Sequence, residues 1–289
     1  MLCRRKGKLN MRKHLSLLFI FVLLLVAAAG CSSESSSQSS GGKKESQTKE
    51  TKEPLSKEEF AKMISNADEY KGAKVDFYAK VFVEPEKSDD GVYIQAFADP
   101  KNSEQNVIIV ADPKTNVKTD DIIHVVGTVR ESFEGENALG GTVTAPVIDA
   151  EKVEKTDYIT AFSQPLKTIE VNKEINQHGY IVKLNKVEVA EDETRAYVTI
   201  SNQSNDKINF WEHNAKLLVG NTQHEKADNF EAGYPEVPSD ILPKATVDVI
   251  IPFPAVDPNE KTIMLYFEGS SENYDINIEP FQFDVTLNQ

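Results

Sequence analysis

Apolar and polar residues alternate along much of the chain after residue 55, and this pattern predicts β-strands. Every second residue from Val75 to Val83 is apolar, and Asp90-Gly91 is a hairpin-turn signal. Further strands are predicted at residues 92–99, 107–111, 122–129 and 147–153, with a turn-rich excursion from Phe133 to Pro146. Five short strands predict a small β-barrel.

One helix is predicted ahead of these strands. Ser56 and Glu59 have the spacing of a capping box, in which each residue satisfies a backbone N–H of the other. The apolar residues that follow share one helical face: Phe60, Met63, Ile64 and Ala67. We expect the helix to end at Tyr70-Lys71-Gly72.

The strand pattern resumes beyond a junction at residues 157–165. It is clearest in the last third, where apolar residues alternate through 247–253, 263–267 and 281–287. Several antiparallel strands with one buried face each predict a β-sandwich. The sequence therefore predicts a mainly β chain, with a barrel over residues 55–157 and a sandwich over residues 158–289.

The N-terminal segment has the pattern of a secretory signal. Basic residues up to Lys13 precede an unbroken apolar run from Leu17 to Ala29. This run of thirteen residues is shorter than the roughly 20 that a membrane-spanning helix needs. Residues 1–30 are therefore predicted to be a signal peptide.

The apolar run ends in Ala28-Ala29-Gly30-Cys31, which resembles the lipobox of bacterial lipoproteins. The resemblance implies cleavage between Gly30 and Cys31 and diacylation of the Cys31 thiol, although the family usually has Leu in place of Ala28. Two acyl chains hold a protein stably on a membrane. We therefore expect lipid anchoring on the extracytoplasmic face of the cell membrane. A retained N-terminal anchor with an incidental Cys31 is the alternative.

Residues 31–54 are predicted to form a disordered tether. Between residues 32 and 54 there are eight serines and no aliphatic or aromatic residue, so this stretch cannot bury a core. The only other cysteine, Cys3, would be lost with the signal peptide. The folded body then has no disulfide and no thiol chemistry, which is typical of extracytoplasmic proteins of Gram-positive bacteria.

The charge of the chain argues against nucleic-acid binding. The formal net charge is −14, and residues 1–30 contain six basic residues and no acidic one, so the mature chain would be still more acidic. Nucleic acids are bound chiefly by basic groups that neutralise phosphates. A nucleic acid is therefore not an expected partner.

The first domain resembles the oligonucleotide/oligosaccharide-binding (OB) fold, in the anticodon-binding-like form found in lipoproteins. The resemblance covers residues 55 to about 155 and rests on Tyr70-Lys71-Gly72 before a strand, on Asp121–Val129, and on Pro146–Ala150. Such barrels often bind ligands across the face of their second and third strands. The resemblance implies three candidate ligand-binding residues: Tyr78, Tyr93 and Phe97.

The second domain resembles an immunoglobulin-like extracellular domain family of unknown function that includes immunoprotective antigens. The matching residues are Val198–Ser204 and Leu242-Pro243-Lys244, where the family often has Gly in place of Lys244. Trp211, the only tryptophan, either packs over a sheet or offers a stacking surface for a sugar or peptide. The aromatic loop 229–235, which is punctuated by Gly and Pro, adds Phe230 and Tyr234 as ligand-binding candidates.

No catalytic signature is present in the sequence. The chain lacks a Gly-x-Ser-x-Gly elbow, a His-Glu-x-x-His motif, a phosphate-binding Walker loop and an EF-hand loop. His213 and His224 could act as metal ligands with Glu212 and Glu225 if the fold brought them together, but their spacing matches no zinc pattern. No metal, cofactor or catalytic residue is therefore predicted.

Taken together, these features predict a membrane-anchored cell-surface lipoprotein that acts as a non-enzymatic binding or assembly module. Its expected partners are an envelope protein, a peptide or a polysaccharide. A hydrolase or transferase that acts on the cell envelope is the alternative. A pair of Asp or Glu side chains that converge in a deep cleft would favour the alternative.

Overall fold

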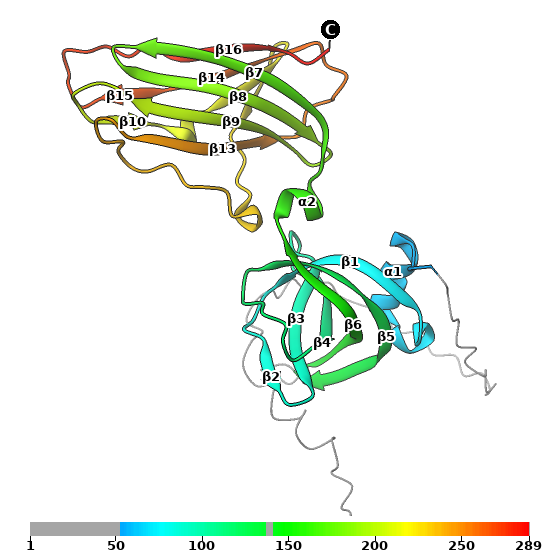
Figure 1. Ribbon diagram of the computed structural model, residues 1–289. Helices are drawn as coiled ribbons and strands as arrows, with labels where there is room; N and C mark the ends of the chain where they lie inside the picture. Colours follow the sequence, from blue (N-terminus) through cyan, green and yellow to red (C-terminus); the bar gives the residue numbers. More distant parts are fainter. Residues whose placement is uncertain (1–52, 137–140, 289) are drawn as a thin grey trace, which may run out of the picture. The chain divides into compact units, whose positions relative to one another are not determined.

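The computed structural model describes residues 53–136 and 141–288, most of which lie in β-strands (Figure 1). The prediction of a mainly β chain is confirmed. The described residues divide into two compact units, the first ending at Thr156 and the second beginning at Asp157. The predicted signal peptide and almost all of the predicted tether, with Gly30 and Cys31, lie outside the described residues.

The first unit opens with helix α1 (Lys57–Ser65), which the capping box begins. The Ser56 hydroxyl accepts a hydrogen bond from the Glu59 N–H, and the Glu59 carboxylate accepts one from the Ser56 N–H. Met63, on the apolar face, is completely buried. The α-helix ends earlier than predicted, because a 3₁₀ turn, η3 (Ala67–Tyr70), replaces its last part.

Five strands of this unit close into a ring in the order β1-β5-β6-β4-β3, because β1 also pairs with β3. Neighbouring strands are antiparallel except β4 and β6, which pair in parallel. A short strand, β2, extends the ring beside β3. The strands are β1 (Lys74–Val81), β2 (Glu86–Ser88), β3 (Gly91–Asp99), β4 (Glu104–Ala111), β5 (Ile122–Glu136) and β6 (Thr142–Thr156).

The alternating apolar residues of the ring point into its interior. Val75, Ala79 and Val81 of β1 are fully buried, together with Ile94 of β3 and Ile109 of β4. They belong to one hydrophobic cluster that also holds Met63 of α1. The residues that the alternation predicted to share one face of each strand are therefore the ones that face the core.

The expectation of a turn-rich excursion from Phe133 to Pro146 is wrong. Strands β5 and β6 continue through most of this stretch as a long hairpin, in which Phe133 lies opposite Ala145 and Glu136 opposite Thr142. Two register shifts in β5, one of them at Val126/Gly127, bend the hairpin. Pairing between the two arms thus extends both strands beyond the residues that alternation alone indicates.

The second unit begins with a short helix, α2 (Tyr158–Phe162), that the sequence pattern did not predict. Its N-cap is Asp157, whose carboxylate accepts a hydrogen bond from the Thr160 N–H at 2.9 Å. The unit contains two four-stranded antiparallel sheets, which we call the front sheet and the back sheet. The front sheet has the order β13-β9-β8-β7, and the back sheet has the order β12-β11-β14-β16.

The front sheet consists of β7 (Pro165–Gln177), β8 (Tyr180–Ala190), β9 (Glu193–Asn202) and β13 (Thr246–Pro254). The back sheet consists of β11 (Lys216–Val219), β12 (Thr222–Glu225), β14 (Thr262–Phe267) and β16 (Phe281–Thr286). The remaining elements are the pair β10 (Ile208–Phe210) and β15 (Gly269–Ser271), with the 3₁₀ turns η4 (Glu212–Asn214) and η5 (Phe230–Ala232).

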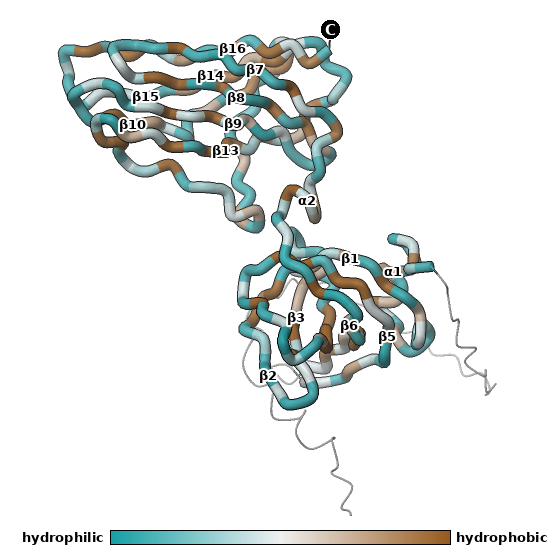
Figure 2. The backbone as a smooth tube through the Cα atoms, viewed as in Figure 1, coloured by the Kyte–Doolittle hydropathy of each residue, from teal (hydrophilic) through white to brown (hydrophobic). Residues whose placement is uncertain are grey.

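One hydrophobic cluster joins the two sheets. Leu184 and Phe253 of the front sheet and Leu265, Phe267 and Phe283 of the back sheet belong to it and are buried. Figure 2 shows the corresponding alternation of hydrophobic and hydrophilic residues along these strands. Two sheets that bury one face each against a shared core have the character of a β-sandwich.

The edge strand β7 is tied by side chains to the part of the chain that enters and forms β16. The Lys173 ammonium donates to the Asp284 carbonyl oxygen at 2.8 Å. The Gln177 amide donates to the Glu279 carbonyl oxygen at 2.7 Å and accepts from the Glu279 N–H at 2.8 Å. These bonds join the two sheets at an edge where no backbone ladder connects them.

Candidate functional site

The outer face of the front sheet is polar, and its residues follow from the alternation along each strand. Ala196 and Val198 belong to the core, so Arg195 and Tyr197 of β9 project to the outer face. Pairing between strands places Glu188 opposite Arg195 in one row across the sheet. The next row runs from Glu170 through Lys186 and Tyr197 to Ile250.

Arg195 is completely buried although it lies on the outer face. Its Nε and Nη2 donate to Glu188 Oε2 at 3.1 and 3.0 Å, and its Nη1 donates to Glu193 Oε1 at 2.7 Å. Nη1 also donates to the hydroxyl of Ser163, which follows α2, at 2.7 Å. Both carboxylates are about as well buried as the core. The guanidinium is therefore neutralised and hydrogen-bonded where water is excluded.

The loop 226–240, which we call the strap, covers this row. Asn229 of the strap donates to Glu193 Oε2 at 2.8 Å, and the Tyr234 hydroxyl donates to Glu193 Oε1. Burial and the neighbouring Glu193 carboxylate raise the pKa of Tyr234 above its ordinary value. Burial works to lower the pKa of Arg195, but the hydrogen bond and charge of Glu193 outweigh it and raise that pKa. These shifts keep the Arg195 guanidinium charged and the Tyr234 hydroxyl protonated, so that it can donate to Glu193 and hold the strap.

Tyr197 and Lys186 lie between the buried network of Arg195, Glu188 and Glu193 and the solvent, and we call them the border of this network. The Tyr197 hydroxyl donates to Glu188 Oε2 at 2.8 Å, and the Lys186 ammonium pairs with the same carboxylate. The Lys186 ammonium also lies 4.1 Å from the centre of the Tyr197 ring. Burial works to raise the pKa of Glu188, but hydrogen bonds from Lys186, Tyr197 and Arg195 outweigh it and lower that pKa.

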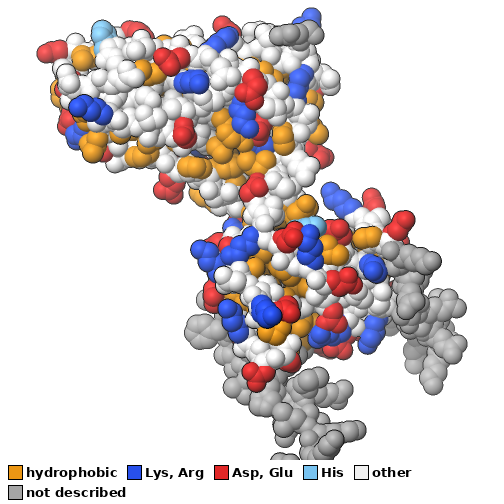
Figure 3. Space-filling view, viewed as in Figure 1, with side chains coloured by type: hydrophobic (Ala, Val, Ile, Leu, Met, Phe, Trp, Pro, Cys, Tyr) orange, Lys and Arg blue, Asp and Glu red, His pale blue; other side chains and the backbone are white. Residues whose placement is uncertain are grey.

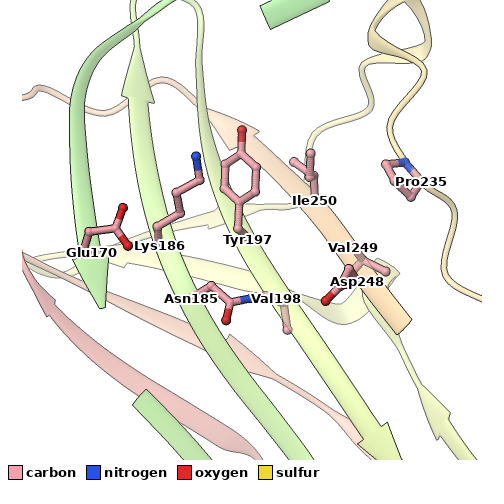
Figure 4. A pocket seen from close by; sticks show the side chains of 9 residues that line it. All are labelled: Glu170, Asn185, Lys186, Tyr197, Val198, Pro235, Asp248, Val249 and Ile250. Carbon is pink, nitrogen blue, oxygen red and sulfur yellow. The ribbon is translucent and has the colours of Figure 1, made fainter. Parts of the chain in front are cut away.

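A groove of about 320 Å³ lies beside this border and crosses all four strands of the front sheet. Figure 4 shows the row from Glu170 through Lys186 and Tyr197 to Ile250, with Pro235 of the strap beyond it. In the space-filling view, hydrophobic side chains gather over β9 and β13, with charged side chains beside them (Figure 3). The lining residues are Glu170, Asn185, Lys186, Tyr197, Val198, Pro235, Asp248, Val249 and Ile250.

A bulge in β8 shapes one side of the groove. The pairing of β8 with β9 shifts between Leu184 and Lys186, which leaves Asn185 as the extra residue. The Asn185 amide donates to Thr199 Oγ1 at 2.8 Å, and the Thr199 hydroxyl donates in turn to Asp248 Oδ1. This chain of bonds fixes the Asp248 carboxylate at the β13 side of the groove.

Two carboxylates of the groove carry uncompensated charge. Within residues 53–136 and 141–288, neither Glu170 nor Asp248 has an ion-pair partner. They project from the two edge strands of the sheet. Adjacent strands lie about 4.8 Å apart, and Asp248 lies two residues along β13 from the row that contains Glu170, so the two residues are about 16 Å apart. They therefore flank the groove rather than converge in it.

The predicted ligand-binding residues of the first unit lie in two places. Tyr93 and Phe97 are half-buried and share the outer face of β3, where Phe97 stacks on Phe82 with ring centres 4.2 Å apart. Tyr78 lies on β1 and stacks instead on His124 of β5, at 4.8 Å. The β3 face also borders Asn106, opposite Phe97, whose Oδ1 is a buried acceptor without a hydrogen-bond partner in the described part of the chain.

The predicted ligand-binding residues of the second unit are also separate. Trp211 follows β10 and is 39% exposed, whereas Phe230 projects from the strap and is 86% exposed. The Tyr234 hydroxyl is engaged with Glu193 inside the network. The strap thus contributes Pro235 to the groove, while Phe230 remains open to solvent.

The histidines considered as possible metal ligands lie in separate elements of the second unit. His213 lies in η4 and His224 in β12. Across the described ranges, no group of three or more His, Cys, Asp or Glu side chains could hold a metal ion. Over the same residues, no helix has the length and apolar character required to cross a membrane.

Comparison with protein-family models, with curated proteins and with solved structures finds no match for this chain. Its functional site is therefore argued from its own geometry. The sequence predicted loop 229–235, which forms part of the strap, as a candidate recognition edge, but it did not single out Lys186, Tyr197, Glu170 or Asp248. The one local signal was the break in alternation at Asn185-Lys186, which marks the β8 bulge.

Proposed function

We propose that this chain is a lipid-anchored protein of the cell surface that binds a partner through its β units and has no catalytic activity of its own. In this proposal Cys31 carries the lipid, residues 32–54 form the tether, and the two units face the extracytoplasmic side of the membrane. The apolar run that ends at Gly30-Cys31 supports the anchor.

The strand pairings support the finer fold assignments within this proposal. A closed ring of five strands with one parallel contact, between β4 and β6, fits an OB-like barrel for residues 55–157. Two antiparallel sheets around one core fit an immunoglobulin-like sandwich for residues 158–289. Folds of both kinds serve many functions, so the binding role rests on the groove and not on the fold.

The groove across the front sheet is the observation that carries the binding role. Its charged and aromatic border is held by bonds within the protein: Lys186 and Tyr197 both engage Glu188, and Asp248 accepts from Thr199. Such a preorganised surface can bind a ligand without rearranging its side chains. Pre-formed grooves with a few fixed polar groups are typical of binding sites.

A hydrolase or transferase gains no support from the same geometry. Paired carboxylates that cleave glycosidic bonds lie about 5–9.5 Å apart. Glu170 and Asp248 lie on opposite edges of the sheet, about 16 Å apart by strand spacing and register. Two carboxylates that the fold does bring together, Glu188 and Glu193, are buried and bound to Arg195.

Intact-mass analysis of the protein from membranes tests the anchor. We expect the wild-type chain to begin at Cys31 and to carry the mass of two or more acyl chains. A Cys31→Ser variant should lack the lipid, because serine has no thiol to form the thioether. A Cys3→Ser variant is the matched control and should be processed like wild type. Retention of unacylated residues 1–30 in the wild-type protein would contradict the proposal.

A further inference from the structure

Strand β13 forms an open edge of the front sheet, because β9 is its only ladder partner among the described strands. Backbone groups of successive residues point alternately to the two sides of a strand. The Ala245 carbonyl oxygen, just before β13, accepts a hydrogen bond from the Asn202 N–H of β9. The Pro252 carbonyl oxygen accepts instead from the Ala227 N–H of the strap. The even-numbered residues of β13 therefore direct their backbone groups away from β9.

The outward backbone groups of Thr246, Asp248 and Ile250 are unpaired. Over residues 53–136 and 141–288, no hydrogen bond from the protein reaches them. Pro252 ends this stretch, because proline has no N–H and its carbonyl oxygen is taken by the strap. A strand edge with unpaired backbone groups is a place where another extended chain can add by main-chain hydrogen bonds.

The groove gives an added strand a place to lie. Asp248, Val249 and Ile250 line it, and Pro235 of the strap lies beyond them (Figure 4). Its volume of about 320 Å³ falls within the range of ligand-binding pockets. Pro235 has no backbone N–H with which to pair with β13. An extended segment can therefore enter beside β13 without displacing a ladder of the protein.

Two side chains of this edge select the residues of the added strand. Asp248 is exposed and Ile250 half-buried, and both project from the outer face of the sheet. Residues directly opposite them on an added strand would project from the same face, where opposite charges or apolar groups stabilise cross-strand pairs. Asp248 has no ion-pair partner in the described ranges. We therefore expect a basic residue opposite Asp248 and an apolar one opposite Ile250.

The charge of the second unit favours a segment of another protein over a second copy of this chain. Residues 158–289 contain 10 basic and 21 acidic residues. Two copies joined edge to edge would bring two acidic surfaces together, each with its own Asp248. Like charges across paired strands are destabilising, whereas a surface of opposite sign speeds the encounter. The segment that fits the edge is therefore basic.

We propose that an extended basic segment of a partner protein adds to β13 as a fifth, antiparallel strand of the front sheet, with Lys or Arg opposite Asp248 and an apolar residue opposite Ile250. This inference deepens the proposed binding role and rests on it. Antiparallel pairing is the more stable per residue, and it places the apolar residue two positions before the basic one. Asp248 and Ile250 each exchange two backbone hydrogen bonds with the residue opposite.

The test measures binding of the labelled peptide Gly-Ser-Thr-Val-Thr-Lys-Thr-Ser-Gly to the full chain in detergent solution by fluorescence anisotropy. We expect saturable binding that weakens as the salt concentration rises, because exposed ion pairs are screened. Exchanging the valine and the lysine, with the composition unchanged, should weaken binding, because lysine would then lie opposite Ile250.

Ester variants of the peptide test the backbone pairing itself. Replacing the N–H of the valine or of the lysine by an ester oxygen should weaken binding about fivefold, because one hydrogen bond to β13 is lost. The matched control places the ester at the threonine between them, whose N–H points away from β13. This control peptide should bind like the parent peptide.

A charge reversal in the protein tests the side-chain pairing. Asp248→Lys should weaken binding of the lysine peptide about tenfold, because an attractive cross-strand pair becomes a repulsive one. The same variant should bind a peptide with glutamate in place of lysine more tightly than the wild-type chain does. Glu260→Lys is the matched control, since it reverses the same charge at an exposed residue outside the groove. Thermal unfolding of each variant checks that the fold is retained.

Equal weakening by Asp248→Lys and Glu260→Lys would overturn the inference, as would equal effects of the esters at lysine and at the control threonine. Failure of the wild-type chain to bind the parent peptide would also overturn it. Dimers of the chain that the peptide dissociates, seen by sedimentation velocity, would show that a second copy occupies the edge instead. None of these results changes the lipid mass at Cys31, so failure of the peptide inference and failure of the anchor can be told apart.

Discussion

At the scale of single residues, Arg195 connects several parts of the second unit through its buried hydrogen bonds. Removing a guanidinium from water costs several kcal/mol, and only close partners offset that cost. Glu188, Glu193 and Ser163 supply such partners at 3.1 Å or less. Because Glu193 also accepts from Asn229 and Tyr234, the charge that stabilises Arg195 also holds the strap.

Replacing Arg195 should therefore destabilise the unit strongly. We expect Arg195→Met to lower the free energy of unfolding by about 3–5 kcal/mol, because two buried carboxylates lose their counter-charge. Urea unfolding followed by Trp211 fluorescence measures the change. Lys207→Met is the control, since Lys207 pairs with Asp240 and Glu272 at the exposed surface, and its midpoint should stay near that of wild type. Equal shifts for both variants would contradict a special role for the buried network.

Residue by residue, the groove could not be predicted from the sequence. Lys186 and Tyr197 occupy outward positions of alternating strands, where polar residues normally face solvent. Their role depends on the strap, which is distant in sequence and places Pro235 beside them. Arg195 has the same local pattern, and its burial depends on Glu188, Glu193 and Ser163, which accept hydrogen bonds from its guanidinium, and on the strap, which bonds to Glu193.

At the scale of elements, strand alternation predicted most positions correctly because each strand has one face against a core. It failed between residues 133 and 146, where pairing of β5 with β6 prolongs both strands. It also missed α2, which is too short to show a helical period. Local pattern thus identifies strands that face a core, whereas ladder pairing decides how far they extend.

Gly127 lies at a register shift between β5 and β6, and the effect of replacing it on stability should be measurable. A Cβ added to Gly127 would lie 2.4 Å from the Asp149 carbonyl oxygen and 3.0 Å from Ile148 Cγ2, so the β5–β6 pairing would have to move. We expect Gly127→Ala to destabilise the first unit by about 1–3 kcal/mol, as overpacking does. Urea unfolding followed by far-UV circular dichroism gives the value.

The neighbouring Thr128→Ala is the control for Gly127→Ala. Thr128 lies on the same strand and is half-buried, and its replacement removes atoms instead of adding them. Its effect should stay within about 0.5 kcal/mol, as for most substitutions at the surface. A Gly127→Ala variant as stable as Thr128→Ala would show that the strand pair has room for a methyl group.

At the scale of the whole molecule, no hydrophobic cluster of the described residues is shared by the two units: a large and a small cluster lie in the first unit, and one large cluster lies in the second. Cores that share no residues can unfold separately, and substitutions in them then have independent effects. Trp211 is the only tryptophan and lies in the second unit, so its fluorescence follows that unit alone. Trp211 fluorescence can therefore be used to follow the unfolding of the second unit separately from that of the first.

We therefore expect Gly127→Ala to leave the Trp211 unfolding transition unchanged while it shifts a separate transition seen by circular dichroism. Arg195→Met should do the opposite. Combining the two substitutions should give the sum of their separate effects. A shift of the Trp211 midpoint by Gly127→Ala would instead show that the two units unfold as one.

The side-chain ties along β7 have a consequence for how copies of the protein behave together. A long edge strand normally exposes a row of backbone groups that another chain can extend, which is a route to aggregation. Here Lys173 and Gln177 join β7 to the carbonyl groups of Asp284 and Glu279. Another copy that paired with the backbone of β7 would have to fit against these side chains and the chain segment that they hold beside the edge, which hinders self-templated assembly.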